Sequence, residues 1–136
     1  MKNQDILQRF LFDGTDVRGE ITTLSSSYQD IIALHDYPQT ISKLFGEFLV
    51  AASLIGASLK QSGMVTVQAT GDGPVSTIMA ECSQGQKLRG IVRGDWDSSK
   101  SSTLSDSANL AEVMGSGTLA ITIEPDQGER YQGIVQ

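Results

Sequence analysis

The 136-residue sequence has almost none of the residues that build metal sites and disulfides. It contains one cysteine, Cys82, and one histidine, His35. A single cysteine excludes an internal disulfide, and no second Cys or His stands at the spacing of zinc ligands. We therefore expect no metal and no cofactor in this chain. A lone free thiol is also typical of a reducing compartment, which indicates a cytoplasmic protein.

Proline and blocks of like charge are also scarce. Three prolines and a hydrophobic fraction of 39% are ordinary for a globular domain and argue against a linker or a disordered chain. The formal net charge of -6 repels nucleic acid and anionic membrane surfaces, so we expect neither as a partner. The first ten residues hold no apolar run, so we expect neither a signal peptide nor a membrane anchor there.

The first third of the chain predicts a hairpin and a short helix. Two β-rich runs, at 6–12 and 17–24, flank an Asp-Gly dipeptide that is typical of tight turns. Ser27 is the predicted N-cap of the short helix. Pro38 forces the residue before it into an extended conformation, so we expect the short helix to end before this proline.

The segment from Pro38 to Lys60 predicts one long helix. Lys43 and Glu47 lie on one stripe of its first half, whereas residues 48–59 carry no charge. Such a short uncharged stretch cannot cross the roughly 30 Å of a bilayer core. We therefore expect protein to bury this half of the helix on every side. Gly63 is expected to stop the helix in a left-handed conformation.

Almost everything after the long helix predicts strand. The predicted strands lie at 64–70, 75–81, 87–93, 117–123 and 129–135. A serine-rich loop from Ser98 to Ser107 interrupts them, and a short helix is expected within Asn109–Met114. The predicted fold class is α+β, with antiparallel β-sheets sandwiching a long buried hydrophobic helix in β/α/β layers. Residues 1–136 are predicted to form a single domain.

Two motifs are candidate sites of chemistry. The glycine-rich turn GDGP at 71–74 lacks the lysine and the following helix of a phosphate-binding loop, so a tight hairpin turn is the favoured interpretation. Cys82, His35 and Asp36 include a nucleophile and a base, but nothing in their spacing brings them together. We expect no enzyme. A small ligand-binding domain or enzyme that uses the GDGP loop or Cys82 remains the alternative.

A third feature is a set of apolar residues on the face of the predicted sheet that should be exposed to solvent. If the alternating apolar residues of 64–70 and 117–123 face the helix, then Met79, Ile91 and Ile134 lie on the opposite face. Nothing else in the sequence is an obvious cover for them, which favours a partner-binding site. The alternatives are scattered surface residues, cover by the short helices, or a structural oligomerisation module.

Five short motifs follow one another along the chain. They are VRGE at 17–20, HDYP at 35–38, VQATGDGP at 67–74, LRGIVR at 88–93 and GERYQGIV at 128–135. In order and spacing they resemble the heat shock protein 33 family, the redox-regulated 33 kDa chaperonins. The resemblance covers practically the whole chain.

This resemblance implies an ATP-independent molecular chaperone, a holdase, that binds unfolding proteins under heat and oxidative stress. It implies that residues 1–136 are the N-terminal client-binding domain, truncated at its C-terminal end, with the redox switch and four zinc-binding cysteines in a C-terminal module absent from this chain. Cys82 matches none of those cysteines. The expected partners are unfolded or partly folded client proteins and a second copy in a homodimer. The expected client-binding residues are Met79, Ile91 and Ile134.

Overall fold

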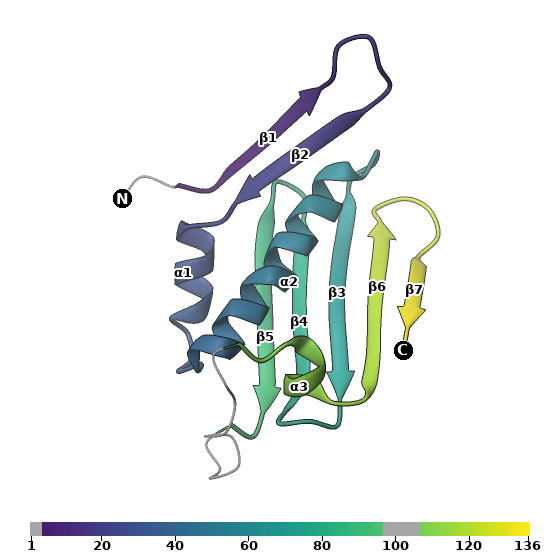
Figure 1. Ribbon diagram of the computed structural model, residues 1–136. Helices are drawn as coiled ribbons and strands as arrows, with labels where there is room; N and C mark the ends of the chain where they lie inside the picture. The colour runs from purple at the N-terminus through teal and green to yellow at the C-terminus, as the bar shows by residue number, and fades with distance from the viewer. Residues whose placement is uncertain (1–3, 97–106) are drawn as a thin grey trace.

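The computed structural model describes residues 4–96 and 107–136 (Figure 1). The elements are β1 (Ile6–Leu11), β2 (Arg18–Thr23), α1 (Ser26–Ile32), α2 (Gln39–Ser58), β3 (Gly63–Gly71), β4 (Val75–Ser83), β5 (Lys87–Gly94), α3 (Leu110–Met114), β6 (Gly117–Pro125) and β7 (Tyr131–Val135). Each predicted helix and strand is confirmed to within a few residues. The predicted serine-rich loop falls outside the described residues except for Ser107.

Five of the strands form one antiparallel sheet in the order β5-β4-β3-β6-β7. The strands β3, β4 and β5 follow one another as predicted, and the last hairpin returns to the free side of β3. The β3–β6 ladder pairs Val65 with Ile123 and Val67 with Ile121. Strands β3 and β6 therefore turn their alternating apolar residues to the same face.

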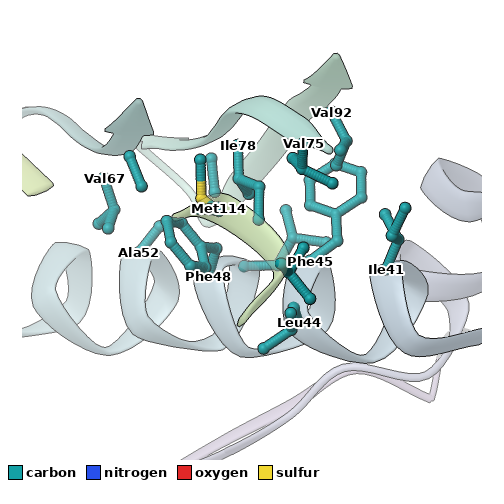
Figure 2. Close-up of a cluster of buried hydrophobic side chains, with 14 of the residues drawn as sticks. Ile41, Leu44, Phe45, Phe48, Ala52, Val67, Val75, Ile78, Val92 and Met114 are labelled. Atoms are coloured by element: carbon teal, nitrogen blue, oxygen red, sulfur yellow. The ribbon is translucent and has the colours of Figure 1, made fainter. Parts of the chain in front are cut away.

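The core lies between that face and α2. Phe45 and Phe48 point from the helix toward Ile78 and Val92 on the strands (Figure 2). Burying a side chain of this size stabilises the fold by about 1.5–3 kcal/mol. Gly90 makes room for this packing, because a Cβ built on it would lie 2.6 Å from Cε1 of Phe45.

The hairpin β1–β2 forms a second antiparallel sheet, which contacts α2 through β2, so the predicted α+β fold of two antiparallel sheets and a core helix is confirmed (Figure 1). This second layer has only two strands in the described part of the chain and lies over the C-terminal half of the helix, near Ser53 and Ala57. The expectation that residues 48–59 are buried on every side is wrong, because Val50 and Leu54 are half-buried and Ser58 is exposed. A two-stranded layer is too narrow to cover the whole circumference of a helix.

By length and composition α2 is a candidate membrane span, and half of its apolar window is buried inside the fold, as in a core helix.

Two local expectations about helix ends are wrong. The N-cap of α1 is Ser25 rather than Ser27, and the cap hydrogen bonds go to the carboxylate of Asp5. Gly63 does not stop α2 in a left-handed conformation: the helix ends where Leu59 becomes extended, and Gly63 opens β3. Glycine is needed at this position for close backbone approach, because a Cβ there would lie 2.6 Å from the carbonyl oxygen of Glu124.

Candidate functional site

The GDGP turn joins β3 to β4 as a hairpin turn, as predicted. Its backbone amides are occupied: Asp72 N–H donates to the carbonyl of Ser116 at 3.2 Å, and Gly73 N–H donates to that of Met114 at 2.7 Å. The Asp72 carboxylate accepts the Ser116 N–H at 2.9 Å. A phosphate-binding loop needs such amides free to point at the anion. The turn therefore serves to tie α3 and the start of β6 to the sheet.

Cys82 lies on the helix-facing side of β4 and is 2% exposed. Its sulfur packs against α2 at Gly56, where a Cβ would lie 2.9 Å from Sγ. Burial raises the pKa of the Cys82 thiol by desolvating the thiolate, so the nucleophilic form is disfavoured. His35 is exposed before α2, where its ring lies 5.5 Å from that of Tyr37. The Cys82 thiol donates to the carbonyl of Ser83 at 3.8 Å, which is not a base.

The three predicted client-binding residues lie in one row on the face of the five-stranded sheet turned away from α2, which we call the open face. Strand pairing aligns Ile91 with Met79, Met79 with Gln68, Gln68 with Ala120, and Ala120 with Ile134. Directly paired residues of antiparallel strands point to the same face, so this row crosses all five strands. Ile134 is 61% exposed, and Met79 and Ile91 are half-buried.

The rows beside this apolar row are polar. On one side lie Thr66, Thr122 and the cross-strand ion pair of Glu81 with Arg89. Gln132 donates to the Thr122 hydroxyl at 2.9 Å. The open face is therefore less apolar than expected from the sequence, since its apolar row is one residue wide and has Gln68 at its centre. Whether Met79, Ile91 and Ile134 bind clients stays a prediction.

Sequence reasoning missed a second apolar surface, on the hairpin β1–β2. We call it the outer hairpin face, and it is made of Ile6, Phe10, Phe12 and Ile21. These side chains are between 40% and 55% exposed. The signal lay in the alternation of β1, but both of its faces carry apolar residues, so the sequence did not show which face would turn outward.

Polar side chains on the inner side of the hairpin hold it on α2. Arg9 donates to the carbonyl of Ala57 at 2.5 Å and pairs with Glu20 at 3.1 Å. The Thr22 hydroxyl lies 3.0 Å from that of Ser53. Because one strand face makes these contacts, alternation turns the other face away from the helix. The two candidate surfaces, open face and outer hairpin face, therefore lie on opposite sides of the sandwich.

The class of protein that these features define is an α+β domain in which two antiparallel sheets pack around one helix, with apolar side chains exposed on the outer surface of each sheet. The sequence model of the family described as "Hsp33 protein" matches residues 5–136, and the chain belongs to this family. Similar curated relatives are the 33 kDa chaperonins of Shewanella sp. (strain MR-4), 51% identical over 97% of this chain, and of Ectopseudomonas mendocina (strain ymp), 47% identical over 96% of it.

The chain spans only 44% and 43% of the lengths of these two relatives. A crystal structure of a 33 kDa chaperonin (heat shock protein 33 homolog) from Thermotoga maritima has the same fold, with a TM-score of 0.78 over 95% of this chain and 44% of that chain. The sequence identity to that protein is 16%, so this likeness supports the fold alone.

Proposed function

We propose that the chain is the client-binding part of an ATP-independent holdase, which binds unfolding proteins under heat and oxidative stress and prevents their aggregation. The observation that carries the proposal is the apolar row of Ile91, Met79 and Ile134 across the open face. Family membership supports it, because the relatives are named chaperonins.

The row suits a client of no fixed sequence. Neighbouring strands lie about 4.8 Å apart, so a row across five strands is about 20 Å long, roughly the span of a six-residue extended segment. Apolar burial contributes about 25 cal/mol per Å² and has no directional requirement. The threonine and charged residues on either side keep the apolar contact narrow, which favours weak and reversible capture.

The geometry weakens the alternative function, a small ligand-binding domain or enzyme. The amides of Asp72 and Gly73 are committed to Ser116 and Met114, and the Cys82 thiol is buried against α2. These were the two features that favoured chemistry at a small-molecule site.

We propose a cytoplasmic, redox-regulated protein that forms a homodimer when active, with zinc bound by cysteines outside this chain. The residues of this chain do not fit a zinc site: Cys82 is its one cysteine and is buried, and the described residues contain no cluster of metal-ligating side chains.

The experiment is light scattering of a heat-unfolding client protein without ATP, with the complete protein added in oxidised and in reduced form. We expect Ile91→Asp to weaken the suppression of aggregation several-fold. The matched control is Thr70→Asp, which adds the same charge to the open face outside the apolar row. If a folded Ile91→Asp variant suppresses client aggregation as well as the wild-type protein does, the apolar row is not the client-binding site. No suppression by the wild-type protein in either redox state would contradict the chaperone function.

A further inference from the structure

We propose that the open face prefers extended client segments in which acidic residues flank an apolar one. The inference rests on the proposed function and names the chemistry of the segments that the open face captures. Its basis is a line of three cations on β5, which we call the basic stripe: Lys87, Arg89 and Arg93. The basic stripe runs along β5 and crosses the apolar row at Ile91.

Strand alternation places the basic stripe on the open face. The β4–β5 ladder pairs Ile91 with Met79, and the three cations lie an even number of positions from Ile91 on β5. Such positions point to one face of a strand, so the basic stripe is turned away from α2. All three side chains are exposed. The whole chain has ten Lys and Arg residues and a formal net charge of -6, so β5 concentrates positive charge on an acidic protein.

Little negative charge offsets the basic stripe. Glu81 pairs with Arg89, whose side chain is 76% exposed and binds the carboxylate through Nε, so its other N–H groups can reach an acidic ligand. Within the described residues neither Lys87 nor Arg93 forms an ion pair. Asp95, which follows the end of β5, offsets part of the charge of Arg93. Lys87 and Arg93 therefore present cations that lack a carboxylate partner in this part of the chain.

The spacing of the basic stripe matches an extended peptide. Arg89, Ile91 and Arg93 follow one another on one strand face at intervals of about 7 Å, and an extended peptide repeats its own side chains at the same interval. A segment that lies along β5 can place an apolar side chain on Ile91 and an acidic side chain on each neighbouring cation. The ligand pattern is therefore acidic, any residue, apolar, any residue, acidic.

Electrostatics selects this pattern over neutral and basic segments. An exposed pair of opposite charges contributes roughly 1.4- to 5-fold to an equilibrium constant, so two pairs favour the acidic segment by about 2- to 30-fold. Two lysines at the same positions would be repelled by the basic stripe. The net charge of -6 repels long polyanions, whereas two carboxylates held within the Debye length of about 8 Å respond mainly to the nearby cations.

The test measures the binding of three fluorescein-labelled peptides to the complete protein, in the redox form that suppresses client aggregation. The peptides are SGETVTEGS, SGQTVTQGS and SGKTVTKGS, which share a central valine and differ only in the charge two positions away on each side. Fluorescence anisotropy gives each affinity. We expect the acidic peptide to bind about 3-fold or more tightly than the glutamine peptide and the lysine peptide to bind most weakly. This preference should disappear in about 0.5 M NaCl.

Variants locate the preference on the basic stripe. We expect Lys87→Gln/Arg93→Gln to bind the acidic and glutamine peptides equally, with the affinity of the wild-type protein for the glutamine peptide. Arg89 is left in place because Glu81 would otherwise lose its ion-pair partner. The matched control is Lys43→Gln/Lys60→Gln, which removes two exposed cations outside the open face and should keep the preference. Loss of the preference in this control as well would overturn the role of the basic stripe.

The other outcomes separate this inference from the function on which it rests. Equal affinities for the three peptides, or no binding of any of them, would overturn the inference, while suppression of client aggregation would leave the proposed function standing. A photo-crosslinking phenylalanine derivative at Thr77, the strand partner of Arg93, identifies the occupant. Cross-links to another segment of the same protein instead of the acidic peptide would overturn the inference in favour of that segment. No peptide binding together with no suppression would overturn both.

Discussion

Gln86, in the turn between β4 and β5, makes two hydrogen bonds with Ser53 of α2. The Ser53 hydroxyl donates to Oε1 of Gln86 at 2.6 Å, and Nε2 of Gln86 donates to the Ser53 carbonyl at 3.2 Å. Because the single Ser53 hydroxyl proton goes to Gln86, Thr22 of the hairpin is the donor in its 3.0 Å bond to Ser53. One chain of polar contacts therefore joins all three layers.

Gln86 is held in a left-handed conformation, with φ of 58°, which is unusual for a residue other than glycine. We expect Gln86→Ala to lower the free energy of unfolding by about 1–2 kcal/mol, because it removes both bonds and leaves buried Ser53 groups without that partner. Urea denaturation of Gln86→Ala, Ser53→Ala and the double variant measures the effect. Additive losses in the double variant would show that Gln86 does not act through Ser53.

Asp5 replaces a helix cap and gives the fold a pH dependence. Burial raises the pKa of the Asp5 carboxyl, but hydrogen bonds from the Ser27 hydroxyl and from the N–H groups of Ser25, Ser27 and Ser26 outweigh it and leave this pKa below the ordinary value of 3.8. A carboxylate whose pKa is lower in the folded state stabilises the fold fully above the unfolded pKa of about 3.9 and loses this effect as the pH falls below it.

We therefore expect Asp5→Asn to destabilise the protein at pH 7 by about 1 kcal/mol, the ordinary value of a lost cap. The difference from wild type should shrink as the pH falls below about 4. Thermal unfolding of both proteins between pH 3 and pH 7 measures it. Asp30→Asn, at an exposed position of the same helix, is the control. A difference that stays constant with pH would contradict the role given to Asp5.

Gly90 is a packing requirement of the core. A Cβ at this position would lie 2.5 Å from the Met79 carbonyl oxygen and 2.6 Å from the Phe45 ring. We expect Gly90→Ala to cost about 1–3 kcal/mol through overpacking. In Gly133→Ala, on the same sheet, the new methyl group meets nothing closer than 3.6 Å, so its stability should stay within about 0.5 kcal/mol of wild type. Equal denaturation midpoints for the two variants would contradict this packing.

The Cys82 thiol should be unreactive in the folded protein. Burial raises the pKa of Cys82, so both access and thiolate formation limit its alkylation. We expect iodoacetamide to label Cys82 only as fast as the protein opens, with a rate that rises with urea. The control is a Cys82→Ala/Ser76→Cys variant, which moves the thiol to an exposed position of the same strand. Equally fast labelling of both proteins without denaturant would show that Cys82 is accessible.

Individual helices and strands were predictable because their signals are local. The Asp-Gly turn, the uncharged run after Phe48 and the alternation from Met64 to Thr70 each indicate one element, and the structure has a turn, a helix and a strand at those places. The predictions of a helix cap at Ser27 and of a helix stop at Gly63 were wrong because groups distant in the sequence determine the local structure at both places. Asp5 captures the amides of α1, and the close approach of Glu124 explains Gly63.

The sequence by itself determined the fold class, the family and the residues that share each strand face, because period-two alternation and short motifs are properties of neighbouring residues. Only the tertiary structure decided that Ile91, Met79 and Ile134 line up in one row, since that alignment depends on the register of strands far apart in the chain. It also decided that Phe10 and Ile21 turn outward. Both faces of the hairpin carry apolar residues, and the long-range contacts of Arg9 and Thr22 with α2 selected which face lies inside.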